Sequence, residues 1–430
     1  MRDLNEIVRY LRSRGEVLEI REPLAPELEP TKYIIESDGK GLALVFTVKG
    51  SALKCVANIL NSRRRLYELL RASGDEEAYE RVIRALGSRW STKKINFNDT
   101  YREIDVSLQN MPAIKFYRGD GGRYITSSIV IAKTPEFDSY NASIHRLMVI
   151  GDKLLTIRLV PRHLHHIVKE NMKVGKETPI AIAIGAHPLA LLAASLSPPY
   201  GVFELELFEH LSGECLEVAR TPIYDIPVPA HASVVIEGRI TRGVADEGPF
   251  LDIIGLYDRV RKQPIIAVDK IYFNKGDVLF HVILPASNEH KILMGFPREA
   301  LIWDAVKKVV ARVRKVRLTP ASGCWLHAVI SIKKNMEGDG KSAIMAAFAA
   351  HPSLKHVIVV DEDIDPDNLE EVEWAIATRL QAGRGLVVVR YARGSTLDPS
   401  SADGITDKLG IDATMPLGKE EMFRRPEPPK

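Results

Sequence analysis

The sequence predicts an α+β protein in three parts, because the spacing of its apolar residues changes twice along 430 residues. The opening part, residues 1–103, mixes helical and strand patterns and indicates a small α/β unit. Residues 104–297 carry closely spaced strand patterns with few helices, which is typical of a barrel or a two-sheet sandwich. A helical pattern at 298–316 then links to residues 317–430, where strands and helices alternate and predict a parallel α/β domain.

The first helix is predicted by its cap and by its apolar spacing. Asp3 can accept hydrogen bonds at the helix start, and apolar residues recur at helical intervals from Leu4 to Leu11. Gly15 stands where a left-handed residue would end the helix. The other elements predicted for this part are a strand at Val17–Ile20 and helices at Leu66–Leu70 and Tyr79–Leu86.

The remaining elements follow from the same two periodicities. The central strands are predicted at Tyr124–Ile131, Leu154–Leu159, Pro179–Ile184, Ala232–Ile240 and Pro264–Val268. Within this part only Leu189–Leu196 is strongly helical. In the C-terminal part, strands at His327–Ile332, His356–Val360 and Gly385–Tyr391 alternate with helices at Ser342–Ala350 and Leu369–Leu380. The tail from Glu420 to Lys430 is too polar and proline-rich to fold alone.

Composition excludes several classes of protein. Lys and Arg number 59 against 56 Asp and Glu, a net charge of +3 that gives no global field for nucleic acid or an anionic membrane. The three cysteines are far apart, which argues against a disulfide framework and favours a reducing compartment. The first residues lack the features of a signal peptide, and no apolar run is long enough to span a bilayer. We therefore expect a soluble cytoplasmic protein.

The most informative stretch for chemistry is Glu247–Asp252, which places two acids around a Gly-Pro pair. Gly and Pro interrupt regular structure, so the backbone can turn both carboxylates into one pocket. Carboxylates held close together do not both ionise readily, and one of them then acts as an acid near neutral pH. The alternative from spacing alone is an ordinary loop with two solvated acids.

A second candidate stretch runs from Asn141 to Arg146. In extended geometry Asn141, Ser143 and His145 face one side of the strand, whereas Ile144 and Arg146 face the other. An arginine on a buried strand needs an anionic partner, which the two acids at 247 and 252 would supply. The alternative is a surface arginine.

Two further clusters invite a metal-binding interpretation. His163, His165 and His166 lie close together, but there is no cysteine partner or zinc-protease spacing, and His165 and His166 are expected at the surface. A site of one His, one Asn and one carboxylate would suit Mn²⁺ or Mg²⁺ beside a phosphate. The acidic run Asp361–Asp365 could hold Mg²⁺, although strand ends and helix starts favour acids for structural reasons. No dinucleotide, P-loop or serine-hydrolase motif is present.

Several ordered segments together resemble the UbiD family of prenylated-flavin-dependent decarboxylases. They are NASIHRLMVIGDKLLTIRLVPRH, PPYGVFELELFEHLSGE, VPAHASVVIEG, EGPFLDIIGLY, SGCWLHAVISIKK, VIVVDEDIDPDNLEEVEWAIATR and KLGIDAT. The resemblance covers most of the chain from about residue 100 onward and, more weakly, the N-terminal helix and strand.

This resemblance implies a cofactor, prenylated FMN, whose phosphate is held through Mn²⁺ with K⁺ beside it. The implied metal ligands are Asn141, His163 and Glu204, with Arg162 as the alternative to His163. Oxygen and imidazole ligands suit a hard ion that bridges to phosphate. The implied cofactor-binding residues are Ile144, His145, Arg146, Arg158, Leu159, Val160, His163, Leu164 and Lys408.

The family's catalytic trio falls on Arg146, Glu247 and Asp252. Arg146 would hold the substrate carboxylate or the acids, Asp252 would deliver the proton that replaces carbon dioxide, and Glu247 would tune and re-supply it. Many members carry a glycine where this chain has Leu251, a change that restricts the turn and can reshape the pocket. The flavin would accept the electrons as carbon dioxide leaves, which is chemistry that the cofactor brings and the protein orients.

The resemblance also implies a fold, an assembly and a substrate. The fold would be a split β-barrel flavin domain between a small N-terminal unit and a C-terminal α/β domain used in homo-oligomerisation. A separate flavin prenyltransferase would supply the cofactor. The archaeal-type branch suggests decarboxylation of trans-anhydromevalonate 5-phosphate to isopentenyl phosphate in isoprenoid biosynthesis. The alternatives are an aromatic or polyprenyl-4-hydroxybenzoate-type decarboxylase, a metal hydrolase using Asp361–Asp365, and a non-catalytic flavin carrier.

Overall fold

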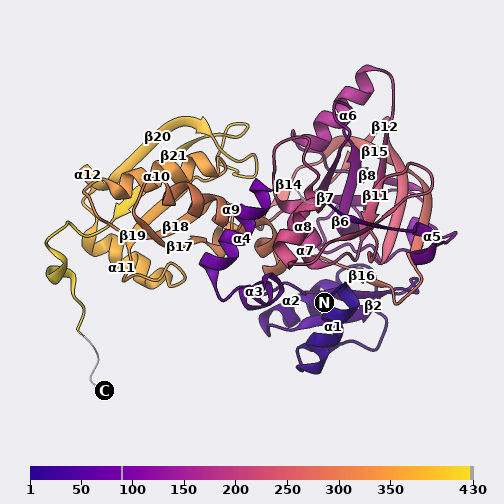
Figure 1. Ribbon diagram of the computed structural model, residues 1–430, viewed down its shortest axis with the longest axis horizontal. Coiled ribbons are helices and arrows are strands. Elements are labelled where there is room, and N and C mark those ends of the chain that lie inside the picture. Colours follow the sequence, from indigo (N-terminus) through magenta and orange to yellow (C-terminus); the bar gives the residue numbers. More distant parts are fainter. Residues whose placement is uncertain (89–90, 427–430) are drawn as a thin grey trace. The chain divides into compact units, whose positions relative to one another are not determined.

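The computed structural model describes residues 1–88 and 91–426 and divides the chain into two compact units (Figure 1). The first unit comprises Met1–Arg71 and Arg84–Leu293, and the second comprises Ala72–Ile83 and Met294–Lys430. Two helices, α4 (Asp75–Gly87) and α9 (Asn288–Lys307), run across the divisions. The boundaries proposed at 103, 297 and 316 stay a prediction.

The elements of the first unit are mostly strands. Its helices and 3-10 turns are α1 (Leu4–Ser13), α2 (Glu29–Gly39), α3 (Arg63–Leu70), α5 (Phe97–Thr100), η1 (Leu108–Asn110), α6 (His163–Lys173), α7 (Pro188–Ser195), η2 (Glu204–Leu207) and α8 (Phe208–Ser212). Its strands are β1 (Val17–Glu19), β2 (Ala43–Thr47), β3 (Lys54–Ala57), β4 (Lys93–Ile95), β5 (Tyr101–Glu103), β6 (Tyr124–Lys133), β7 (Tyr140–Val149), β8 (Leu154–Ile157), β9 (Thr178–Ile184), β10 (Glu217–Arg220), β11 (Pro227–Pro229), β12 (Val234–Glu247), β13 (Phe250–Leu251), β14 (Tyr257–Asp258), β15 (Arg261–Asn274) and β16 (Leu279–His281).

The N-terminal helix forms as the sequence predicts. Asp3 caps α1 by accepting a hydrogen bond from the amide of Glu6 at 2.8 Å, and Gly15 follows the helix with a φ of 70°. The residues that α1 buries are Leu4, Ile7, Val8 and Leu11. Strands β1, β2, β3 and β16 then form a four-stranded sheet, so the N-terminal segment is joined by hydrogen bonds to the end of the central part.

The central strands form one large sheet that returns on itself. Its order is β12-β9-β6-β7-β8-β15-β5, and β12 also pairs antiparallel with β15, which links the two sides into a ring. The strand-rich centre is therefore confirmed. The expectation of a single strong helix there is wrong, because α6 also forms, between β8 and β9. His163–Lys173 buries only Leu164, Ile167 and Val168 and is polar elsewhere, so its apolar pattern is weak.

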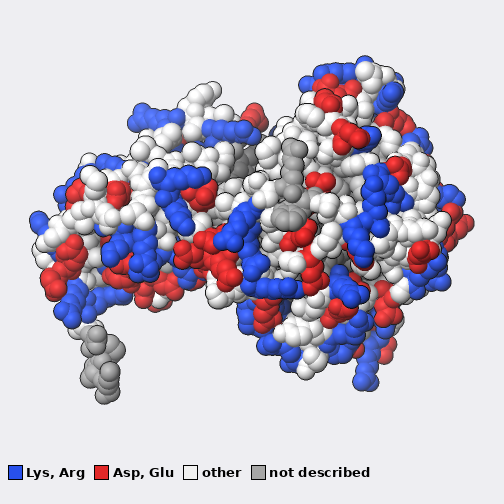
Figure 2. All heavy atoms as spheres, in the orientation of Figure 1, with Lys and Arg blue, Asp and Glu red and all other residues white. Residues whose placement is uncertain are grey.

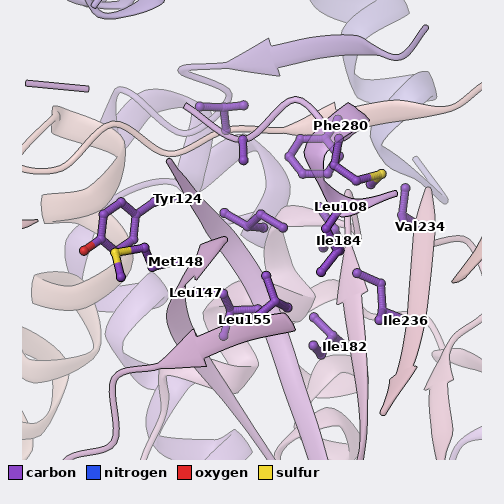
Figure 3. Close-up of a cluster of buried hydrophobic side chains, with 14 of the residues drawn as sticks. Leu108, Tyr124, Leu147, Met148, Leu155, Ile182, Ile184, Val234, Ile236 and Phe280 are labelled. Atoms are coloured by element: carbon purple, nitrogen blue, oxygen red, sulfur yellow. The ribbon is translucent and has the colours of Figure 1, made fainter. Parts of the chain in front are cut away.

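One apolar core fills the first unit (Figure 3). Side chains from the ring, such as Leu147, Ile182 and Ile236, pack in the same cluster as Phe280 from β16. Residues of the N-terminal sheet, including Leu44 and Phe46, belong to this cluster as well. This shared core keeps the strands that carry the candidate site in fixed positions.

The second unit is an α/β domain around a five-stranded sheet. Its elements are β17 (Arg312–Leu318), η3 (Pro320–Ser322), β18 (His327–Lys333), α10 (Asp339–Ala350), β19 (His356–Asp361), α11 (Leu369–Arg379), α12 (Ala382–Gly385), β20 (Leu386–Arg393), β21 (Ile405–Ala413) and η4 (Glu420–Phe423). The order is β17-β18-β19-β21-β20, with β18, β19 and β21 parallel. The last strand predicted, near 385–391, is β20 and is antiparallel to β21, so the third parallel strand was misassigned. The Pro-rich tail lies partly outside the described residues.

The helix predicted at 298–316 is misplaced. Helix α9 begins at Asn288, contains Pro297 and ends at Lys307, and Arg312–Leu318 is strand β17. The predicted start at Arg298 lies ten residues too late, and Pro297 stands inside the helix. Val309, inside the predicted range, is 47% exposed, because the helix has already ended at Lys307.

The chain carries nearly equal numbers of basic and acidic side chains. Figure 2 shows basic and acidic side chains intermixed on the face in view, in keeping with a net charge of +3. Among the helices of the described segments, none combines the length and the apolar character that a bilayer crossing requires.

Candidate active site

The backbone brings β7 beside the hairpin formed by β13 and β14. Strand β12 ends at Glu247, a Gly248–Pro249 turn follows, and β13 pairs with β14 so that Phe250 lies opposite Asp258. Gly121 donates its amide hydrogen to the carbonyl of Pro249 at 2.8 Å. A Cβ at Gly121 would lie 2.1 Å from the carbonyl oxygen of Gly248, so only glycine permits this approach.

The three predicted catalytic side chains lie together. Arg146 donates from Nε to Glu247 Oε1 at 2.8 Å and from Nη2 to Oε2 at 3.0 Å, and its Nη1 lies 3.4 Å from Asp252 Oδ2. Glu247 is fully buried, whereas the Asp252 side chain is 22% exposed. The arginine is therefore clamped to one acid and loosely joined to the other.

The alternation predicted for β7 is also present. Ser143 Oγ donates to Asn141 Oδ1 at 3.3 Å and lies 2.9 Å from His145 Nε2, so these three side chains share one face. His145 Nδ1 lies 3.0 Å from the carbonyl oxygen of Arg158, and burial lowers the pKa of His145 to about 4. Its imidazole is therefore neutral near pH 7 and is committed to partners within the protein.

A third acid, Asp258, completes the cluster and was missed by sequence reasoning. Its Oδ2 accepts from Arg146 Nη2 and from Arg158 Nε, both at 3.1 Å, and its Oδ1 accepts from Arg261 Nη2 at 3.0 Å. Burial raises the pKa of Asp258, but the hydrogen bond from Arg261 and the charges of Arg158 and Arg146 outweigh it, and the pKa lies below its usual range. No local motif marks this residue.

Two aromatic rings pack beside the cluster of Arg146, Glu247 and Asp252, which we call the clamp. The Arg146 guanidinium lies over the Phe250 ring, 4.8 Å from its centroid. Tyr124, whose ring packs in the core of Figure 3, lies 4.2 Å from the Phe250 ring between centroids. Its hydroxyl donates to Glu247 Oε1 at 3.3 Å and accepts from the amide of Gly248 at 3.1 Å. The orientation of Glu247 is thereby fixed from two sides.

The three predicted metal ligands also lie together, around Glu204. This buried carboxylate accepts from Asn141 Nδ2 and from the amide of Ala142, both at 2.6 Å, and His163 Nδ1 lies 3.8 Å from its Oε1. Burial raises the pKa of Glu204, a cost that a bound cation would relieve. Carboxylate, amide and imidazole are donors that suit a hard divalent ion, so the residues fit such a metal.

The other predicted cofactor residues divide into two groups, one before and within α6 in the first unit and the other, Lys408, in the second unit. Leu159 and Leu164 are buried, and Val160 is 37% exposed at the start of the turn before α6. Lys408 belongs to the second unit, where its ammonium donates to the carbonyls of Pro352 at 2.6 Å and Leu354 at 2.8 Å. Burial lowers the pKa of Lys408 to about 8. These bonds give Lys408 a structural use within its own unit, and its contact with a cofactor stays a prediction.

The acids of the run Asp361–Asp365 form ion pairs with basic side chains of the second unit. Arg379 bonds to Asp361 at 2.8 Å and to Asp363 at 2.6 Å, and Lys315 bonds to Asp365 at 2.8 Å. Among residues 1–88 and 91–426, no group of three or more His, Cys, Asp and Glu side chains is arranged to hold a metal ion. These basic partners give the acids of the run a structural use within the second unit.

Comparisons with known proteins match nearly the whole chain. Family models described as the N-terminal, Rift-related and C-terminal domains of 3-octaprenyl-4-hydroxybenzoate carboxy-lyase, UbiD, match residues 8–86, 89–288 and 291–413. A relative from Aeropyrum pernix named anhydromevalonate phosphate decarboxylase is 47% identical over 92% of this chain and 89% of its own.

Solved structures give the same result. The UbiD-class enzyme HmfF from Pelotomaculum thermopropionicum, in complex with FMN, has a TM-score of 0.95 and 38% identity, covering 99% of this chain and 97% of its own. An evolved dimeric form of the same enzyme, in complex with prFMN, has a TM-score of 0.91 and 34% identity, covering 100% and 97%.

Proposed function

The chain belongs to the UbiD family of carboxy-lyases, and from this premise we propose that it decarboxylates a phosphorylated α,β-unsaturated acid without net oxidation, using prenylated FMN. The substrate that we propose is trans-anhydromevalonate 5-phosphate, which would yield isopentenyl phosphate. The observation that carries the proposal is the clamp in which Arg146 lies between Glu247 and Asp252. The Aeropyrum pernix relative supports the substrate through its name and its 47% identity.

We propose that the ring of strands is a split barrel that binds the flavin. The phosphate of the flavin would be held through Mn²⁺, with K⁺ beside it. Asn141, His163 and Glu204 would hold the divalent ion, because they offer hard donors around a buried carboxylate. The two HmfF structures, which contain FMN and prFMN, support the choice of flavin. We also propose a homo-oligomer that receives its cofactor from a flavin prenyltransferase.

When bound, prenylated FMN would supply the electron sink for carbon dioxide release. The side chains of this protein would position the substrate and transfer the proton. Arg146 would attract the substrate carboxylate and hold it near the acids, since a guanidinium pairs with carboxylates through two parallel hydrogen bonds. Asp252 would give its proton to the carbon that loses carbon dioxide, and Glu247 would keep Arg146 in place and help to re-supply that proton.

The proposed function is tested by reconstitution. The purified protein, loaded with prenylated FMN and Mn²⁺, is given a panel of unsaturated acids, and carbon dioxide release is measured. We expect release from trans-anhydromevalonate 5-phosphate at the highest kcat/KM. Preference for an aromatic acid or a polyprenyl-4-hydroxybenzoate would overturn the substrate assignment, and release from none of the acids would overturn the decarboxylase proposal.

The metal site gives a prediction that needs no turnover. Glu204→Gln removes the only buried carboxylate charge of the candidate metal ligands, so affinity for Mn²⁺ is expected to fall by at least about 10- to 100-fold. The measurement is Mn²⁺ binding by paramagnetic resonance, together with the flavin retained after gel filtration. Glu209→Gln, on the neighbouring α8, is the matched control. Equal Mn²⁺ affinity in both variants would contradict the role of Glu204.

A further inference from the structure

We propose that the loop Tyr117–Gly121 positions Asp252 for proton transfer, an inference that rests on the proposed function. Asp252 follows β13 directly, in a hairpin whose two strands, β13 and β14, are each two residues long. A hairpin this short is marginally stable by itself in water, so other parts of the protein must hold it in place. The loop contacts the hairpin at both of its strands, and these contacts set where Asp252 lies.

The first contact lies directly before β13. Gly121 donates its amide hydrogen to the carbonyl of Pro249 at 2.8 Å. A Cβ at Gly121 would lie 2.1 Å from the carbonyl oxygen of Gly248, whereas real Cβ atoms stay at least 3.0 Å from their neighbours. A side chain at Gly121 would therefore push the turn that joins Glu247 to the hairpin away by about 1 Å.

The second contact is made to β14. Gly119 donates its amide hydrogen to the hydroxyl of Tyr257 at 3.2 Å, and a Cβ at Gly119 would lie 2.7 Å from Cζ of this ring. Tyr257 is the register partner of Leu251, the residue before Asp252. The loop is thus joined to the hairpin at one point before Asp252 in the chain and at one point after it.

The carboxylate of Asp120 fixes the shape of the loop. Its Oδ2 accepts from the amide of Tyr117 at 2.9 Å, and the amide of Asp120 donates to the carbonyl of Tyr117 at 3.0 Å. Asp120 is 3% exposed. Burial raises the pKa of Asp120, and the backbone amides of Tyr117 and Leu251 act in the opposite direction. The carboxylate therefore interacts with the hairpin as well as with its own loop.

The loop is in turn anchored to the core through the two residues that precede it. The carbonyl of Phe116 accepts from Thr31 Oγ1 at 2.9 Å, and the carbonyl of Lys115 accepts from the amide of Leu28 at 2.8 Å. The buried Phe116 ring packs edge-on against the ring of Phe250, with 6.4 Å between centroids. Because these bonds tie the loop to the N-terminal segment, the loop gives the hairpin a fixed support.

Asp252 depends on this support because its own side-chain contacts constrain it little. Its Oδ1 accepts from the amide of Ile253 at 2.6 Å, a bond within the same hairpin, and its Oδ2 lies 3.4 Å from Arg146 Nη1. A proton donor must lie within hydrogen-bond reach of the atom that it protonates. A displacement of about 1 Å can lower the rate by about 100-fold.

The test is a double-variant cycle between the loop and Asp252. Gly121→Ala is made in the wild-type protein and in Asp252→Asn, and single-turnover rates are measured with prenylated FMN, Mn²⁺ and trans-anhydromevalonate 5-phosphate. We expect Gly121→Ala to lower the rate by about 10- to 100-fold in the wild-type protein, with KM unchanged, and to cause no further loss in Asp252→Asn. A purely structural role would give the same loss in both backgrounds.

The matched control is Gly122→Ala, at the next residue of the chain. A Cβ there would lie 3.1 Å from Cγ and Sδ of Met148, a flexible side chain that can move aside, so the rate is expected to stay at the wild-type value. Tyr257→Phe serves if Gly121→Ala does not fold. It removes only the hydroxyl that accepts from Gly119, and a loss of about 3- to 10-fold is expected, again only while Asp252 is present.

A second readout is amide hydrogen exchange of the hairpin, residues 250–258, in the same preparations. Exchange is expected to be faster in Gly121→Ala and in Tyr257→Phe than in Gly122→Ala, because the hairpin opens more often when a contact to the loop is lost. Rates of turnover are expressed per bound flavin, so an unfolded fraction cannot imitate the expected loss.

The outcomes separate this inference from the proposed function. Full turnover in Asp252→Asn would overturn the proposed role of Asp252 and this inference with it. A slow Asp252→Asn, combined with unchanged rates in the loop variants or with equal losses in both backgrounds, would overturn this inference alone. Unchanged hydrogen exchange of the hairpin in Gly121→Ala and Tyr257→Phe would also overturn it.

Discussion

Replacement of Asp252 by Asn is expected to lower kcat for carbon dioxide release by about 10²- to 10⁴-fold, the usual contribution of a positioned general acid. Asp252 is the acid best placed to exchange a proton, because it contacts Arg146 through a single atom pair at 3.4 Å and is 22% exposed. Asparagine has the same shape but has no carboxyl proton to give. The fold and the bound flavin are therefore expected to be retained.

The measurement is the single-turnover rate of the reconstituted variant, with flavin content read from its absorbance. Asp246→Asn is the matched control, because this acid is adjacent to Glu247, is 61% exposed and pairs only with Lys262 among the described residues. Full turnover in Asp252→Asn would show that the proton comes from another group. Loss of turnover together with loss of flavin would indicate a binding role.

The parts of the site that sequence reasoning predicted are those with a local cause. The Gly-Pro pair between Glu247 and Asp252 interrupts the strand, and the turn at Gly248–Pro249 does bring both acids to one arginine. Strand alternation likewise predicted that Arg146 lies on the face of β7 opposite to that of Asn141 and Ser143. In both cases a local feature of the chain, a Gly-Pro turn or the alternation of a strand, sets where the side chains point, although Arg146 meets the two acids across 101 and 106 residues.

Asp258 could not be predicted in this way, because no turn motif or periodic strand pattern marks its position. It bonds to Arg146 across 112 residues and to Arg158 across 100. Only the pairing of β13 with β14 brings it opposite Phe250, and a two-residue strand leaves no periodic signal. Glu204 was likewise found through a family resemblance, since its partners Asn141 and Ala142 lie on a distant strand.

The misplaced helix has a different physical cause. Apolar residues at 301, 302, 305, 309 and 313 suit a helix, yet RVRKVRL at 312–318 also alternates as a strand does. Pairing with β18, which spans the same length, decides between the two patterns. Tertiary contacts therefore override a periodicity that fits either structure.

Removal of the Arg146 charge is expected to lower the free energy of unfolding of the first unit by about 3–5 kcal/mol, the cost of breaking a buried ion pair from one side. Arg146→Met keeps most of the side-chain volume, but it leaves the fully buried Glu247 with Tyr124 as its remaining side-chain partner among the described residues. Asp258 keeps Arg158 and Arg261 and is affected less. The measurement is the urea dependence of the near-ultraviolet signal.

The matched control is Arg239→Met, because Arg239 also bonds to two acids, Glu177 and Asp269, but is 39% exposed. Its expected cost is about 0–1 kcal/mol, since water screens exposed pairs. The double variant Arg146→Met, Glu247→Gln is expected to be less destabilised than the sum of its parts, because the second change removes the unpaired charge left by the first. Equal costs for Arg146→Met and Arg239→Met, or simple additivity in the double variant, would show that the clamp does not hold the buried charge of Glu247. Arg146 could then bind the substrate carboxylate without a loss in the free energy of unfolding.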